Sequence, residues 1–220
     1  GLPRRAALYE VVPEPVARLV GHELGLLVSL VRWAGRRRHG VGGDVEAFGY
    51  AREQAPLMYG LAYACAVETA VVSWLLWDVP VVHEVFLVLD VYTVLFVLGL
   101  HAASVTRPHL LDGRVLRLRQ GCHTDLAVPL DAVAAVRYEP LFTHERAEGE
   151  LNLVVGGRTS LTLEPAAPVE VVGLLGRRRQ VRVVRFHADD PRALLAALGR
   201  ERTTLRRERT APSPAPGTPA

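Results

Sequence analysis

Two long apolar runs dominate the pattern of hydrophobic and polar positions along the chain. They cover residues 57–77 and 83–103, with a short connection around Asp78 and Pro80 between them. A helix of about 20 residues is roughly 30 Å long, which matches the hydrocarbon core of a bilayer. Two buried soluble helices of this apolarity would need a larger protein around them. The pattern therefore predicts a two-helix transmembrane hairpin within residues 45–106.

A shorter amphipathic stretch precedes the hairpin. Residues 15–36 carry apolar side chains at the helical period, with Pro15 in the first turn and Gly35 at the end. The apolar stripe is too short to span a bilayer, and Glu23 and Arg32 would have to be buried in it. Two interpretations stay open for this part of the N-terminal region, residues 1–44. The helix either lies in the membrane interface or packs on protein as an ordinary amphipathic helix.

After the second apolar run the pattern changes from helical spacing to alternation. Seven strand-like segments follow, separated by turn residues such as Gly121 and Pro129. They cover 114–119, 124–128, 133–138, 151–155, 160–163, 169–172 and 181–186. Asp190 and Pro191 then mark the start of a helix over 192–198. Residues 107–199 are thus predicted to form a small β-barrel or sandwich closed by one helix. Residues 200–220 are predicted to be a disordered tail, and the fold class is an α+β membrane protein.

Short motifs in the alternating region resemble bacterial pleckstrin-homology-like domains. They are RPH at 107–109, LRLRQG at 116–121, VPLDAV at 128–133 and the helix start FHADDPRALL at 186–195. Residues 48–100 also look like a group of uncharacterised actinobacterial integral membrane proteins, so the resemblance covers roughly residues 45–199. It implies a scaffold for contacts with proteins or lipids, and it implies no catalytic residues.

The distribution of charge predicts an orientation. The 26 basic residues, all arginine, give a net charge of +3. Arginines flank the hairpin on both sides and are missing from its connection at 78–84. By the positive-inside rule both ends of the hairpin face the cytoplasm, as in a multi-pass cell-membrane protein with cytoplasmic termini. The arginine runs have no interleaved aromatic residues, so we expect no nucleic-acid partner.

Some of these arginines are candidates for contact with the anionic headgroups of the inner leaflet. The candidates are Arg36, Arg37 and Arg38 before the hairpin, and Arg114, Arg117 and Arg119 after it. Arg117 and Arg119 share one face of a predicted strand. The lysine of the lipid-binding pattern in eukaryotic pleckstrin-homology domains is missing, so diffuse surface charge is the plainer expectation.

Four polar side chains interrupt the apolar runs at chemically interesting positions. Glu68 and Asp90 are expected at similar depth in the hairpin, where one or both carboxyls would be protonated. His83, Asp90 and His101 follow one face of the second run. These groups either hydrogen-bond the helices of this chain or of a partner together, or carry protons or an ion.

The sequence contains no motif that indicates catalysis. The patterns GxSxG, GxGxxG, HExxH and the P-loop are missing, and Cys65 and Cys122 lack metal-ligand or CxxC spacing. We therefore expect a non-enzymatic, membrane-anchored scaffold or accessory protein without cofactor or metal. Its cytosolic domain would contact a protein partner or the lipid surface, with partner or self-association through the transmembrane helices. The alternative is a subunit of a proton- or ion-coupled membrane system that uses Glu68 and Asp90.

Overall fold

The computed structural model describes residues 14–37, 39–40, 42–43, 45–144, 147–173 and 177–210. Its helices are α2 (Glu14–Ala34), α3 (Ala55–Leu75), α4 (Pro80–Thr106) and α5 (Pro191–Thr210), with a 3₁₀ turn η1 (Leu130–Ala132). Its strands are β1 (Glu46–Phe48), β2 (His109–Asp112), β3 (Val115–Gln120), β4 (Thr124–Pro129), β5 (Val133–Leu141), β6 (Glu150–Leu153), β7 (Thr159–Pro165), β8 (Val169–Val172), β9 (Arg178–Val181) and β10 (Val183–Phe186). The fold is mixed α and β, as expected.

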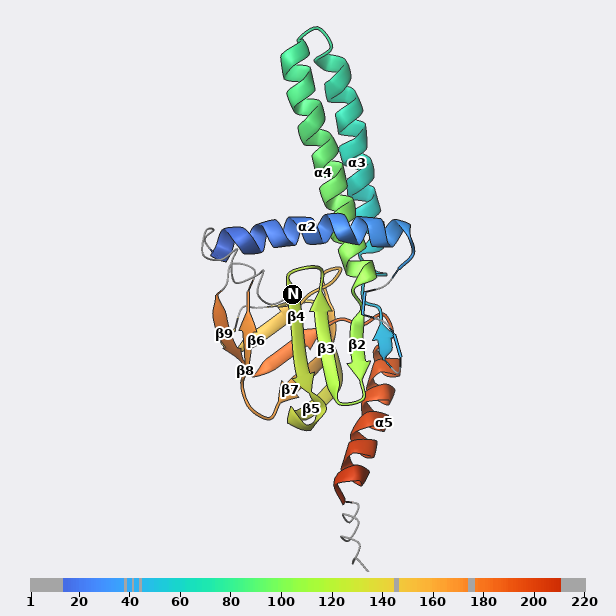
Figure 1. Ribbon diagram of the computed structural model, residues 1–220, viewed down its shortest axis with the longest axis vertical. Coiled ribbons are helices and arrows are strands. Elements are labelled where there is room, and N and C mark those ends of the chain that lie inside the picture. The colour runs from blue at the N-terminus through green and yellow to red at the C-terminus, as the bar shows by residue number, and fades with distance from the viewer. Residues whose placement is uncertain are drawn as a thin grey trace, which may run out of the picture.

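Helices α2, α3 and α4 form an upper layer over the β domain, and α5 runs downward beside the sheets (Figure 1). Helices α3 and α4 stand side by side as a long hairpin, and α2 lies across its base, between the hairpin and the sheets. Proline residues occupy the first turns of both hairpin helices, where a missing N–H costs no hydrogen bond. Helix α4 extends three residues beyond the predicted run at each end, so its last turn reaches the β domain.

The strands form two four-stranded sheets and a separate two-stranded ribbon, β8–β9. The first sheet has the order β1-β2-β3-β4 and the second β5-β7-β10-β6, where only the β10–β6 pair is parallel. Neither sheet closes on itself, so the barrel half of the prediction is wrong. The chain leaves the first sheet at Pro129 and passes through η1 into the second sheet. The sequence could not predict this, because alternation along a strand does not specify which strand is its neighbour.

One hydrophobic core joins both sheets and α5. It includes Leu116 and Leu118 of the first sheet, Leu161 and Leu163 of the second, and Leu194 of α5, all fully buried. The side chains that alternate inward along each strand therefore meet between the sheets. The last helix covers this core, as the sequence predicts.

The hairpin is inserted between two neighbouring strands, which the predicted domain boundaries missed. Strand β1 precedes the hairpin and pairs antiparallel with β2, which follows it, with Glu46 opposite Leu111 and Phe48 opposite His109. Residues near 45–51 thus belong to the β domain and not to the hairpin. Three residues are too few to reveal an alternating pattern, and their partner lies some 60 positions away in sequence.

The last helix is longer than predicted. Helix α5 continues to Thr210, so the predicted disordered tail is wrong for residues 200–210. Arg202 donates to the carbonyl of Val133 at 3.0 Å, and Leu205 packs against the core. These tertiary contacts stabilise a segment whose composition is mainly charged. Residues 211–220 of the predicted tail and residues 1–13 of the N-terminal region lie outside the described residues.

Candidate membrane interface

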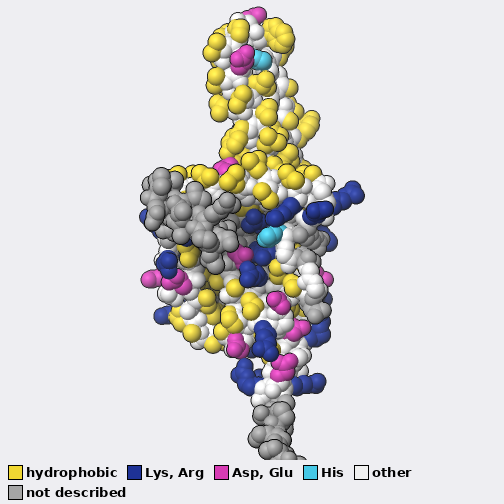
Figure 2. All heavy atoms as spheres, viewed as in Figure 1, with side chains coloured by type: hydrophobic (Ala, Val, Ile, Leu, Met, Phe, Trp, Pro, Cys, Tyr) yellow, Lys and Arg dark blue, Asp and Glu magenta, His cyan; other side chains and the backbone are white. Residues whose placement is uncertain are grey.

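The hairpin presents an apolar surface that is not covered by the rest of the chain. Both helices are long and apolar enough to cross a membrane, yet only 6% of the apolar window of α3 and 22% of that of α4 are buried. Figure 2 shows hydrophobic side chains along the whole visible face of the hairpin. The core helices of a soluble protein would be mostly buried. Exposure of this extent therefore favours contact with lipid.

Helix α2 continues the same apolar surface at the base of the hairpin. Its exposed apolar side chains are Val16, Leu19, Val20, Leu24, Leu27, Val28 and Val31. In Figure 2 hydrophobic side chains form a band along the upper edge of α2, next to the hairpin. Of the two interpretations of the amphipathic stretch, the exposed stripe favours a helix in the interface over one whose apolar face packs on protein.

The opposite side of α2 is fixed between α4 and the β domain. Leu26 is buried against Gly99 of α4, where an added Cβ would lie 3.2 Å from that of Leu26. Gly25 meets the β3–β4 turn, because a Cβ there would lie 3.1 Å from Sγ of Cys122. The Ser29 hydroxyl is also buried and lies 3.8 Å from the same sulfur. Small residues therefore let α2 approach both neighbours closely.

The two histidines predicted inside the hairpin connect its helices. Nε2 of His83 in α4 is 2.6 Å from the Ser73 hydroxyl in α3. Nε2 of His101 in α4 is 3.2 Å from the Tyr59 hydroxyl in α3, and the two rings meet edge-on at 4.8 Å. The structure thus places one polar contact near each end of the hairpin.

The two predicted carboxyls lie in different environments. Glu68 is exposed on α3, and no hydrogen bond joins it to Asp90 in the part of the chain that the structure describes. Oδ2 of Asp90 is buried without a hydrogen-bond partner there. A third carboxylate, that of Glu23 in α2, accepts a hydrogen bond from the Tyr92 hydroxyl of α4 at 2.9 Å. This bond ties α2 to the hairpin.

The arginines that follow the hairpin are poorly placed for headgroup contact. Arg114 lies in the β2–β3 turn, at the end of the sheet away from the hairpin, and pairs with Glu208 of α5 at 3.4 Å. Arg119 is buried, with Nε 3.4 Å from Asp125. Arg117 is exposed and lies 3.6 Å from the same carboxylate. Arg117 and Arg119 therefore share one carboxylate and do not form a shared cationic face.

The arginines that precede the hairpin are placed at its base. Arg36 and Arg37 are both exposed and line a groove together with Trp33 at the end of α2. Arg38 lies outside the described residues. Among the described arginines predicted to contact headgroups, Arg36 and Arg37 are thus exposed beside the base of the hairpin.

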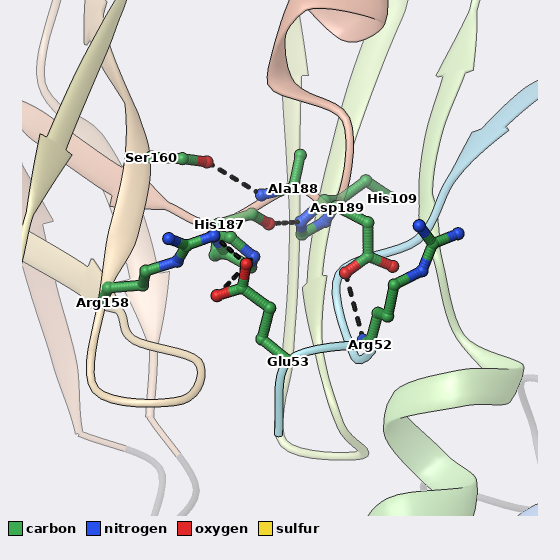
Figure 3. Close-up of polar contacts among 8 residues, drawn as sticks. All are labelled: Arg52, Glu53, His109, Arg158, Ser160, His187, Ala188 and Asp189. Atoms are coloured by element: carbon green, nitrogen blue, oxygen red, sulfur yellow. Dashed lines mark hydrogen bonds and ion pairs between the residues drawn. The ribbon is translucent and has the colours of Figure 1, made fainter. Parts of the chain in front are cut away.

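A polar cluster fixes the hairpin to the β domain, and the sequence pattern did not single out its members (Figure 3). Glu53, just before α3, pairs with Arg158 and lies 3.7 Å from Nε2 of the buried His187. Burial and the nearby Arg158 guanidinium lower the pKa of His187. The N–H of Arg52 donates to Oδ1 of Asp189 at 3.1 Å. The segment that enters α3 is thus held by the loop that enters α5.

A second set of contacts lies behind this cluster, around the buried ring of His109. Its Nδ1 accepts the N–H of Arg119 at 3.0 Å, and its Nε2–H donates to the carbonyl of His187 at 2.8 Å. Burial lowers the pKa of His109 to about 4. Tyr50 stacks on this ring at 4.7 Å, and its hydroxyl accepts the N–H of Gly121 at 2.8 Å. Burial raises the pKa of Tyr50 to about 12.

The chemistry of these groups is that of structural contacts. Within the described ranges, no three His, Cys, Asp or Glu side chains gather where they could hold a metal ion. Comparison with protein-family models, with curated proteins and with solved structures gave no match. The geometry of the interface is therefore the basis for a functional conclusion.

Proposed function

We propose that this protein is a non-enzymatic scaffold or accessory protein anchored in the cell membrane. Helices α3 and α4 cross the bilayer, and α2 lies in the interface. The observation that carries the proposal is the exposed apolar surface that runs along the hairpin and onto α2. Burial of such a surface in lipid is strongly favourable, at roughly 25 cal/mol for each Å² removed from water.

The β domain is the part that contacts a protein partner or the lipid surface. Two sheets that share one core under a C-terminal helix support its likeness to pleckstrin-homology-like domains, although the sheets are open. Its attachment supports a presenting role, because β1 and β2 clamp both ends of the hairpin. The domain is thus held at a fixed height below the membrane.

The distribution of arginine supports an orientation with the β domain in the cytoplasm. Asp78 in the loop at the far end of the hairpin and Glu84 near the start of α4 are acidic, whereas Arg36, Arg37 and Arg107 lie at the base. Both ends of the hairpin then lie on the cytoplasmic side, and α2 lies on the inner leaflet.

Two measurements test the anchor and its orientation. The wild-type chain should stay in the membrane fraction after washing with alkaline carbonate. In a variant with Cys65→Ala and Cys122→Ala, a cysteine at Asp78 should react with a membrane-impermeant maleimide in intact cells. A matched cysteine at the exposed Phe142 should react only after lysis. Labelling of Phe142→Cys in intact cells would contradict the orientation, and release by carbonate would contradict the anchor.

The alternative function is proton or ion coupling through the intramembrane carboxyls. The observation that favours it is Oδ2 of Asp90, which is buried without a hydrogen-bond partner among the described residues. A carboxyl left in this state inside a membrane is costly unless it is protonated or binds something.

A further inference from the structure

A groove lies where α2 ends beside the last turn of α4. Its volume is about 440 Å³, and its walls include Trp33, Arg36, Arg37 and Thr106. That volume is within the roughly 300–1,000 Å³ that is typical of small-ligand sites. The ring of Trp33 meets His101 of α4 edge-on at 5.8 Å. The groove therefore combines an aromatic wall fixed to the hairpin with two cationic side chains.

The backbone that presents these cations is strained at Arg36. Its φ is 52°, in the left-handed region that glycine normally occupies at the end of a helix. The N–H of Arg36 donates to the carbonyl of Trp33 at 3.0 Å, and that of Arg37 to the carbonyl of Arg32 at 2.8 Å. These are the two bonds of a Schellman C-cap. An arginine in this conformation costs free energy that a glycine would not cost. Such strain is found mainly at functional sites.

The surroundings of the groove are positively charged. His39 lies next to the groove, because its N–H donates to the carbonyl of Thr106, a lining residue, at 2.7 Å. Burial lowers the pKa of His39, and so do the nearby guanidinium groups of Arg32, Arg107 and Arg119. These arginines, together with the carboxylate of Asp125, thus lie near His39 beside the groove.

Arg36 and Arg37 remain available for a ligand. Neither side chain forms a hydrogen bond or ion pair with any residue in the described ranges. By contrast, Arg114 and Arg117 have carboxylate partners. A guanidinium offers paired N–H donors that match the oxygens of a phosphate.

The height of the groove on the molecule indicates where such a phosphate would come from. Helix α2 lies across the base of the hairpin, and its upper edge is apolar (Figures 1 and 2). Figure 2 shows arginine side chains directly below this apolar band. If the apolar band is at the level of the acyl chains, the arginines lie at the level of the headgroups. Tryptophan is also enriched at this boundary.

We infer that the groove binds the phosphate group of an anionic phospholipid. Arg36 and Arg37 donate to the phosphate oxygens, and Trp33 packs against the glycerol and the first carbons of the acyl chains. This assignment rests on the proposed membrane function. It gives Arg36 and Arg37 a defined binding site, whereas the sequence predicts only diffuse surface charge. A bound headgroup here would fix the height and tilt of the β domain relative to the bilayer.

The test uses the full chain in a non-ionic detergent, titrated with short-chain phosphatidylglycerol and with phosphatidylcholine of the same length. We expect saturable binding of phosphatidylglycerol and much weaker binding of phosphatidylcholine. Changing Arg36→Gln together with Arg37→Gln should weaken phosphatidylglycerol binding about thirty-fold, the loss of two arginine contacts with anionic headgroups. The matched control, Arg114→Gln with Arg117→Gln, removes the same charge outside the groove and should bind as the wild type does. An equal loss in both double variants would overturn the inference.

Two further measurements distinguish a lipid from free phosphate and test the part played by Arg36. Inorganic phosphate should displace phosphatidylglycerol poorly, and equally tight competition through the same two arginines would assign the groove to free phosphate. Arg36→Gly removes the backbone strain, so it should raise the melting temperature while weakening lipid binding. Unchanged binding in this variant would also overturn the role of Arg36.

Failure of this inference is distinguishable from failure of the proposed function. A wild-type chain that resists carbonate extraction but does not prefer phosphatidylglycerol refutes only the headgroup site. A chain that carbonate releases from membranes refutes the proposed membrane anchor itself.

Discussion

At the residue scale, His109 connects three parts of the molecule through a neutral ring. Its Nδ1 accepts the N–H of Arg119, so that nitrogen carries no proton, and its Nε2–H donates to the carbonyl of His187. Tyr50 and Phe186 cover the ring, at 4.7 and 5.4 Å. A second proton would break the bond from Arg119 and place a charge in a buried site. The neutral form of His109 is therefore part of the native fold.

This arrangement predicts that acidification destabilises the protein. The pKa of His109 falls from an ordinary 6.5 to about 4, and that of His187 is also lowered. Between about pH 6.5 and pH 4 the unfolded chain therefore binds more protons at His109 than the folded chain does, and stability decreases as the pH falls. Each such proton lowers the free energy of unfolding by about 1.4 kcal/mol per pH unit.

Thermal melts of the full chain in detergent check this prediction. The melting temperature should be lower at pH 5.5 than at pH 7.5, and His109→Gln should show a smaller difference between the two conditions. A melting temperature that rises on acidification, or an equal pH dependence in the variant, would contradict the role assigned to His109.

At the element scale, the hairpin is joined by hydrogen bonds from histidine and not by its carboxyls. His83 contacts Ser73 and His101 contacts Tyr59, whereas Glu68 is exposed. Interhelical hydrogen bonds in membranes stabilise by only about 0.6 kcal/mol on average. Close packing of apolar and small side chains must therefore supply most of the association between α3 and α4.

Substitution of the carboxyls separates the two proposed functions. In the scaffold, Glu68→Gln and Asp90→Asn should each change the free energy of unfolding by less than about 1 kcal/mol, because an amide has similar shape and hydrogen-bonding capacity. His101→Phe loses the hydrogen bond to Tyr59 and should destabilise by roughly 0.6 kcal/mol. Melting temperatures in detergent measure both effects. If the carboxyls carry protons or an ion, the amide variants stay folded but abolish a pH-dependent flux in proteoliposomes, and that result would favour the alternative.

At the scale of the whole molecule, the insertion of the hairpin between β1 and β2 couples the position of the hairpin to that of the β domain. Both ends of the hairpin return to adjacent strands of one sheet, and α2 is fixed to both layers through Leu26 and Gly25. The ion pair between Glu53 and Arg158 adds a third attachment. A tilt of the hairpin would therefore be transmitted to the sheets.

This topology predicts which fragment folds without the hairpin. Joining residues 45–54 to 107–210 through a short glycine-rich loop keeps β1 and Tyr50 in place. This fragment should be soluble, with a β-rich circular dichroism spectrum and a cooperative melt. A fragment of residues 107–210 alone exposes the edge of β2 and should melt at a lower temperature. Equal stability of the two fragments would contradict the role assigned to β1.

The candidate interface could be predicted only in outline from the sequence. The exposed stripe of α2 and the arginines at its end follow from local periodicity and composition. The junction could not be predicted, because Glu53 and Arg158 are ordinary surface residues in sequence and lie more than a hundred positions apart. An isolated His109 in a strand likewise gives no signal of the Tyr50 ring that stacks on it. Headgroup contact at Arg114 was predicted from proximity in sequence, yet the turn of β2 carries it to the far end of the sheet.

By itself the sequence predicted α2, the two hairpin helices, the start of α5 and most of the strands, because an apolar period is a local property of the chain. It missed β1, β2 and β9. The tertiary structure decided the rest. It decided that β1 joins β2 across the hairpin, that the two sheets stay open, and that α5 extends to Thr210. Each of these depends on contacts between residues that are distant in sequence. Such contacts stabilise the fold only after the chain has brought the residues together.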